Sequence, residues 1–76
     1  MSGKPIPDFS FLDDCIFLST FSGNKRWKSK DGSRLFTWDS LHGEIEVFNK
    51  RGKHLGVLSP YGNLIKPAKK GRTIDV

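Results

Sequence analysis

Only one cysteine, Cys15, occurs in the chain, so no disulfide can form within it. No second cysteine and no closely spaced pair of histidines accompanies it, which leaves no recognisable zinc site. We therefore expect no metal ion or other cofactor. Asp13 and Asp14 lie beside Cys15 and should raise the pKa of its thiol, which favours a buried residue over a catalytic nucleophile.

Long apolar runs are also missing. The longest run near the start, residues 15–18, is too short for a membrane span or a signal-peptide core, so no targeting segment is visible and no membrane contact is expected of this domain. Leucine and alanine are too sparse for a helical bundle. Six Phe, two Trp and one Tyr instead favour a short twisted sheet around one small core, and 76 residues leave room for a single folded unit.

Negative charge is scarce after residue 24. Residues 25–76 hold 12 of the 13 Lys and Arg but only five of the eight Asp and Glu, a local balance of +7. This excess favours an anionic partner, with nucleic acid first and an acidic protein or membrane surface second. Residues 1–24 carry one cation against three acids and should pack or tether, so we divide the chain into an N-terminal packing segment, 1–24, and a functional domain, 25–76.

The local patterns predict an α+β fold, in which a short N-terminal helix or turn precedes a strongly twisted antiparallel β-sheet. Residues 9–18 fit either a helical turn followed by a strand or one short helix, and we expect the helix. The polar, glycine-containing stretch 19–24 predicts a loop.

Two hairpins are predicted after residue 25 from turn sequences that contain glycine. The first has strands 26–30 and 34–38, and the second has strands 44–49 and 54–58. A short edge strand at 64–65 should follow, and the aperiodic stretch 66–72 should form an irregular basic arm.

The stretch 39–46 places three carboxylates and an imidazole within eight residues of this basic chain. Residues alternate around Ile45 as in a half-buried strand, so Glu44 and Glu46 should share one face. A bend at Gly43 would let Asp39 fold back and hold one ring nitrogen of His42, which leaves the other nitrogen to exchange a proton. The cluster thus has the groups needed for acid–base chemistry, although a solvated acidic face is the simpler explanation.

Metal-free RNA cleavage needs a base for the 2′-hydroxyl proton, an acid for the leaving 5′-oxygen and cations at the phosphate. Glu46 or Glu44 is a candidate base and His42 a candidate acid, but the sequence leaves open which of Glu46 and His42 plays which part. The candidate phosphate clamps are Arg72, Lys66 and the 50–53 turn.

Other residues offer weaker signals. Lys69 and Lys70 of the basic arm are candidate RNA contacts. Phe36 shares a strand face with Trp38 and could stack on bases or lie in the core. His54 has no acid close in sequence and is interpreted as structural or RNA-contacting.

A set of motifs between residues 25 and 74 resembles the C-terminal cytotoxic ribonuclease domain of cloacin and the ribosome-inactivating E-type colicins. The similarity covers about two-thirds of the chain, with about one residue missing near Tyr61, and W-D-S-x-H-G-E-x-E followed by H-L-G is its most specific part. The matching residues are Lys25-Arg26-Trp27, Asp31-Gly32, Trp38-Asp39-Ser40, His42-Gly43-Glu44, Glu46, Gly52, His54-Leu55-Gly56, Pro60, Gly62-Asn63, Lys66 and Arg72.

The resemblance implies a bacterial toxin that cuts small-subunit ribosomal RNA in the decoding site and is neutralised by a cognate acidic immunity protein. It further implies delivery from a producing bacterium, action in the cytoplasm of the target cell, and a monomer apart from its inhibitor. By position, Asp39, His42, Glu46 and Arg72 match the family's catalytic residues. Glu44 and Lys66 match further active-site residues, and Phe36 stands where the family has a tyrosine.

Two alternatives come from other functional classes. A non-catalytic RNA-binding β-domain associated with ribosomes would explain the basic charge, but acids beside a phosphate-binding face would repel RNA. A protein-interaction module for an acidic partner explains the charge but not the cluster around His42. We therefore expect a metal-independent endoribonuclease.

Overall fold

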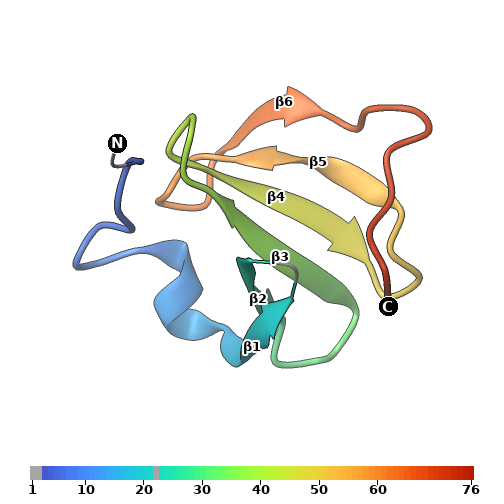
Figure 1. Ribbon diagram of the computed structural model, residues 1–76, viewed down its shortest axis with the longest axis horizontal. Coiled ribbons are helices and arrows are strands. Elements are labelled where there is room, and N and C mark those ends of the chain that lie inside the picture. The colour runs from blue at the N-terminus through green and yellow to red at the C-terminus, as the bar shows by residue number, and fades with distance from the viewer. Residues whose placement is uncertain (1–2, 22) are drawn as a thin grey trace.

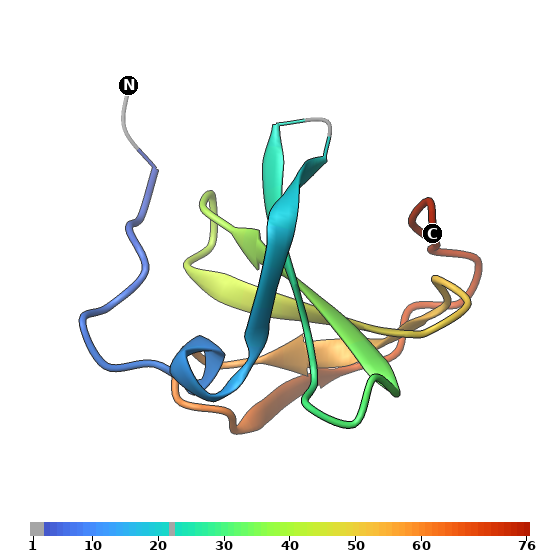
Figure 2. The ribbon, with the colours of Figure 1, turned by 90° about the horizontal axis from the view of Figure 1, so that it is seen from below.

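The computed structural model describes residues 3–21 and 23–76, which form a single antiparallel sheet whose strand order follows the chain (Figure 1). One 3-10 turn, η1, precedes six strands. Their bounds are η1 Phe11–Asp14, β1 Ile16–Phe21, β2 Asn24–Lys28, β3 Arg34–Asp39, β4 Glu44–Asn49, β5 His54–Leu58 and β6 Leu64–Pro67. Figure 2 shows the strong twist, with β1 running at a large angle to β5 and β6. Within the described residues no helix is long and apolar enough to cross a membrane.

The N-terminal part differs from the prediction, and the fold is mostly β. Among the described residues only the four of η1 are helical, and Ser10 caps them by accepting a hydrogen bond from Leu12 N–H. The predicted helix over residues 9–18 is wrong beyond η1, because residues 16–21 pair with β2 along the edge of the sheet. The predicted loop at 19–24 is wrong for residues 19–21 and 24, which belong to β1 and β2, whereas Gly23 lies in the turn between these strands and residue 22 lies outside the described residues.

The two predicted hairpins and the predicted edge strand are present, although β2 spans residues 24–28 instead of the expected 26–30. Strands β4 and β5 have the expected bounds, and β2 pairs with β3 around the Asp31 turn. The N–H of Ser33 and the hydroxyls of Ser29 and Ser33 donate to Asp31 and lower the pKa of its carboxyl to about 2. Strand β6 extends the predicted 64–65 strand to Pro67 and takes up the start of the expected basic arm.

The core lies on one face of the sheet, where η1 covers it. Phe36, Ile45 and Val47 project there from β3 and β4, together with Leu12 and Trp27. The ring of Phe11 in η1 packs edge-on against Phe36, with 5.2 Å between ring centroids. Because η1 and the aromatic residues fill this side, the opposite face of β4 is available for polar residues.

The C-terminal segment, residues 72–76, turns back across the end of the sheet (Figure 1). Thr73 forms an isolated β-bridge with Lys53, and Ile74 N–H donates to the carbonyl of Gly52 at 2.9 Å. Arg26, which is buried, donates to the main-chain oxygen of Asp75 at 2.6 Å. The segment is therefore held at a defined place beside β5.

Candidate active site

Antiparallel register gathers charged side chains on the sheet face opposite the core. Asp39 of β3 lies directly opposite Glu44 of β4. Glu46 of β4 lies opposite Val57 of β5, which in turn pairs with Lys66 of β6. Since side chains alternate along a strand, Glu44 and Glu46 share this face, as predicted.

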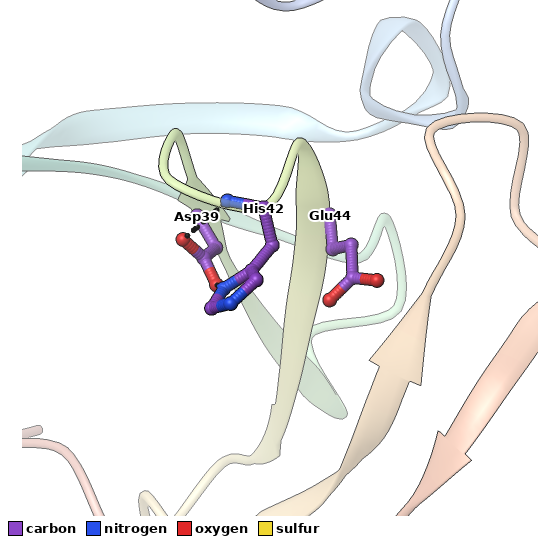
Figure 3. A group of neighbouring side chains, drawn as sticks. All are labelled: Asp39, His42 and Glu44. Carbon is purple, nitrogen blue, oxygen red and sulfur yellow. Dashed lines mark hydrogen bonds and ion pairs between the residues drawn. The ribbon is translucent and has the colours of Figure 1, made fainter. Parts of the chain in front are cut away.

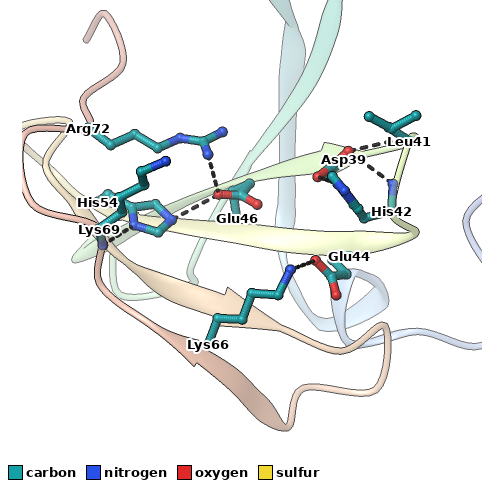
Figure 4. Close-up of polar contacts among 9 residues, drawn as sticks. All are labelled: Asp39, Leu41, His42, Glu44, Glu46, His54, Lys66, Lys69 and Arg72. Carbon is teal, nitrogen blue, oxygen red and sulfur yellow. Dashed lines mark hydrogen bonds and ion pairs between the residues drawn. The ribbon is translucent and has the colours of Figure 1, made fainter.

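Asp39 shapes the turn between β3 and β4 and holds the ring of His42 (Figure 4). Its Oδ1 accepts hydrogen bonds from the N–H groups of Leu41 at 3.0 Å and His42 at 3.2 Å, while its Oδ2 lies 2.8 Å from Nδ1 of His42. Partial burial alone would raise the pKa of Asp39, but the hydrogen bonds from His42 and Leu41 outweigh it and hold that pKa below its ordinary value. The predicted contact between Asp39 and His42 is confirmed, and Nε2 of the ring remains available to exchange a proton.

Glu44 pairs with a lysine from the far edge of the sheet. Nζ of Lys66 lies 3.1 Å from Oε1 of Glu44, and Lys66 is half exposed while Glu44 is mostly covered. The lysine is thus restrained by the carboxylate but still accessible, which suits a cation that could also meet a phosphate.

Glu46 is 4% exposed, and both of its polar contacts are made through Oε1. Nε2 of His54 lies 2.9 Å from this oxygen and Nη1 of Arg72 lies 3.4 Å from it. His54 is also buried, and its Nδ1 accepts a hydrogen bond from Lys69 N–H at 2.9 Å. No described residue hydrogen-bonds Oε2 of Glu46, so that oxygen is free to contact a bound molecule.

These contacts line one cleft of about 230 Å³. It contains all four residues predicted to be catalytic and three of the five predicted to bind substrate. Its lining is Asp39, His42, Glu44, Glu46, His54, Val57, Lys66, Pro67, Lys69 and Arg72.

Two predicted substrate contacts lie elsewhere. Phe36 is 2% exposed and belongs to the core on the opposite face, so its position does not agree with a base-stacking role. The lack of a tyrosine hydroxyl there is consistent with its apolar surroundings. Lys70 is exposed in the arm but is not part of the cleft lining.

Asp39, His42 and Glu44 each offer one ligand atom, and these atoms lie within 4.8 Å of one another (Figure 3). Such a set could bind a small divalent cation. In this structure Asp39 is engaged by His42 and Glu44 by Lys66, so a cation would have to replace both contacts. As it stands, the arrangement pairs Asp39 with a histidine and Glu44 with a lysine of the chain itself.

The sequence did not reveal His54 as the partner of Glu46. The two residues are eight positions apart and meet across the β4–β5 hairpin, where a bulge between Val47 and Phe48 shifts the register. The predicted hairpin was the available signal, because it places the start of β5 beside the second half of β4. The bulge is what brings the imidazole to the carboxylate.

Fold and cleft together define a small twisted β-sheet protein with a histidine–carboxylate site surrounded by cations. The chain belongs to the Cytotoxic family, whose model matches residues 19–75, and the family resemblance inferred from the motifs is confirmed. It is similar to Colicin E3 of Escherichia coli, with 40% identity over 52 residues that cover 66% of this chain and 9% of the relative. Colicin-E6 of Escherichia coli is 39% identical over 51 residues, which cover 64% of this chain and 9% of that protein. The match therefore spans about a tenth of the length of these relatives.

Proposed function

We propose that this protein is a metal-independent endoribonuclease that cleaves small-subunit ribosomal RNA in the decoding site and stops translation. The observation that carries the proposal is the convergence of a histidine held by an aspartate, a buried glutamate and two cations in one cleft. The resemblance to ribosome-inactivating colicins supplies the substrate class. As such a toxin, the protein would be delivered from a producing bacterium and act in the cytoplasm of its target.

Glu46 and His42 are the proposed acid–base pair. With Glu46 as base, the free Oε2 takes the proton of a ribose 2′-hydroxyl, and the 2′-oxygen attacks the adjacent phosphorus. The bond from phosphorus to the 5′-oxygen breaks, and Nε2–H of a protonated His42 supplies the proton to that oxygen. The products are a 2′,3′-cyclic phosphate and a 5′-hydroxyl, and no water or metal ion is consumed in the step.

Arg72 and Lys66 are the proposed phosphate contacts. Each already faces a carboxylate oxygen, Arg72 at 3.4 Å and Lys66 at 3.1 Å, so each is oriented toward the cleft before substrate arrives. Both side chains are about half exposed and can reach a phosphate oxygen. A guanidinium beside the base would stabilise the negative charge that grows on phosphorus in the transition state.

The direct test incubates the purified protein with ribosomes, with and without EDTA, and maps the RNA ends. We expect one discrete cut in the small-subunit RNA that persists in EDTA. A ribosomal substrate with a 2′-deoxy nucleotide at the cut should resist cleavage, because the attacking hydroxyl is missing. Binding without cleavage would instead indicate an RNA-binding β-domain, and a cut abolished by EDTA would refute metal independence.

A matched pair of variants tests the role of His42. His42→Ala should lower the cleavage rate by roughly 10² to 10⁴-fold, the range expected for a lost general acid or base. Leu41→Ala is the control, because Leu41 lies in the same turn with its side chain 73% exposed. Normal cleavage by His42→Ala would exclude the proposed role.

The proposed partner besides the ribosome is an acidic immunity protein, with the toxin domain otherwise a monomer. The +7 balance of residues 25–76 supports an acidic partner, as does the resemblance to the toxins. Steering between opposite charges is screened by salt, so association with the inhibitor should be faster at low ionic strength. An association rate that does not change with salt would count against this partner.

A further inference from the structure

We propose that His54 is a positioning residue of the cleft, an inference that rests on the proposed function. Its neutral ring orients Glu46 and connects residues 69–72, the last part of the basic arm, to β4. His54 is 2% exposed, so it is not placed to exchange protons with bulk solvent or to make extensive contact with RNA. Its ring and its backbone N–H nevertheless contact Glu46, Lys69 and Arg72, which all line the cleft.

The hydrogen bonds define the tautomer of the ring. The backbone N–H of Lys69 donates to Nδ1 at 2.9 Å, which requires a lone pair on Nδ1. A neutral imidazole with that lone pair carries its proton on Nε2, the atom 2.9 Å from Oε1 of Glu46. His54 therefore donates to Glu46 as a neutral group, and protonating Nδ1 would set two N–H groups against each other.

The same residue holds the arm in place through its main chain. His54 N–H donates to the carbonyl of Arg72 at 3.0 Å, and Arg72 N–H closes a turn on the carbonyl of Lys69 at 3.2 Å. The ring thus contacts one end of this turn and the backbone contacts the other. Edge-on packing against Phe48, with 5.2 Å between ring centroids, fixes the plane of the imidazole.

These contacts converge on one oxygen of the proposed base. Oε1 of Glu46 receives both the Nε2–H of His54 and the guanidinium of Arg72 (Figure 4). With Oε1 engaged from two sides, Oε2 is left for the 2′-hydroxyl of the proposed reaction. Small displacements of a catalytic group can lower the rate by about 10²-fold, so contacts that hold Glu46 in one orientation should raise the cleavage rate.

Two substitutions separate the two nitrogens of His54. His54→Gln can place an amide N–H near the position of Nε2 and keep the donor to Glu46, but it loses the acceptor for Lys69. His54→Asn can place an amide oxygen near Nδ1 and keep that acceptor, but it does not reach Glu46. We expect His54→Asn to lower kcat roughly 10 to 100-fold with little change in KM. His54→Gln should retain most of kcat and raise KM, because the arm is loosened.

A stability control and a spectroscopic measurement complete the test. Ile45→Val weakens the core on the opposite face of β4 and should lower stability without either kinetic change. Nitrogen-15 NMR of the wild-type ring should report a lone pair on Nδ1 and the proton on Nε2. Equal losses of kcat in both His54 variants, losses that merely follow stability, or an Nδ1–H tautomer would overturn the inference. A wild-type protein that cuts no RNA would instead refute the proposed function, whatever the tautomer.

Discussion

Replacing Asp39 with asparagine should reverse the tautomer of His42 and disable it. In the wild type, Oδ1 of Asp39 accepts from the N–H groups of Leu41 and His42, and Oδ2 faces Nδ1 of the ring. An asparagine that keeps Oδ1 on the two backbone groups points its NH₂ at Nδ1. The amide then donates to the ring, and the proton of a neutral His42 moves to Nε2.

The alternative orientation of the asparagine is less favourable. Turning the amide by 180° would restore an acceptor for Nδ1–H but would set NH₂ against two backbone N–H groups. Leaving a buried donor without its acceptor costs about 1 to 3 kcal/mol, so losing two hydrogen bonds to keep one is disfavoured. Partial exposure of the turn reduces this difference without changing its sign.

The rate should fall whichever proton transfer His42 performs. With the proton fixed on Nε2, the ring cannot act as a base through that atom. As an acid it would have to donate from the neutral form, because the imidazolium would place Nδ1–H against the amide. Both cases remove acid–base catalysis, which is worth roughly 10² to 10⁴-fold.

Single-turnover cleavage of ribosomes, together with nitrogen-15 NMR of the His42 ring, measures both effects. The pKa of Asp39 is below its ordinary value, so the ionised carboxylate stabilises the wild-type fold, and the wild type should be more stable than Asp39→Asn at neutral pH. That advantage should fade as the pH falls below about 3.9 and through the lowered pKa. An Asp39→Asn protein that cleaves at the wild-type rate with its Nε2–H tautomer demonstrated would refute the reasoning.

Four further substitutions, with one control, separate catalysis, binding and folding. Glu46→Gln removes a base and a negative charge, so ribosome cleavage should be abolished while ribosome affinity, measured at equilibrium, stays equal or rises slightly. Arg72→Ala and Lys66→Ala should each flatten the slope of log affinity against log salt by about 0.7, the single-strand value for one phosphate contact. Lys30→Ala, with the same charge change outside the cleft, should affect the slope less, and an equal effect would argue against specific contacts. Gly52→Ala should lower the unfolding free energy by at least about 1 kcal/mol, because Gly52 has φ +86° and its new Cβ would collide with the backbone of the C-terminal segment. Unchanged stability would show that the segment adapts.

Local chemistry was sufficient to predict part of this structure. The β4–β5 hairpin has the predicted bounds because its strands alternate and its turn contains glycine. The contact between Asp39 and His42 was also predictable, since a carboxylate that caps a tight turn reaches a side chain three residues on. Both features depend only on neighbours in the sequence.

What sequence reasoning missed depends on distant partners. The apolar run at 15–18 is compatible with helix or strand, and pairing with β2 decides for strand β1. The position of Arg72 depends on the C-terminal segment, which Arg26 helps to hold through a hydrogen bond across 49 residues. Phe36 could be read as a stacking residue or a core residue, and the packing of Phe11 against it places it in the core. None of these contacts leaves a local signal.

Burial of Glu46 links the stability of the site to its chemistry. A carboxylate that is 4% exposed would be strongly destabilising unless donors or cations meet it. Here one donor is the buried His54 and the other is the half-exposed Arg72. An arginine that compensates for a buried carboxylate must lie beside it. A phosphate would also have to lie beside this carboxylate for Glu46 to act as the base. The three acids of the cleft, Asp39, Glu44 and Glu46, are therefore consistent with RNA cleavage, because each lies next to a cation or a histidine that orients it and reduces its repulsion of the substrate.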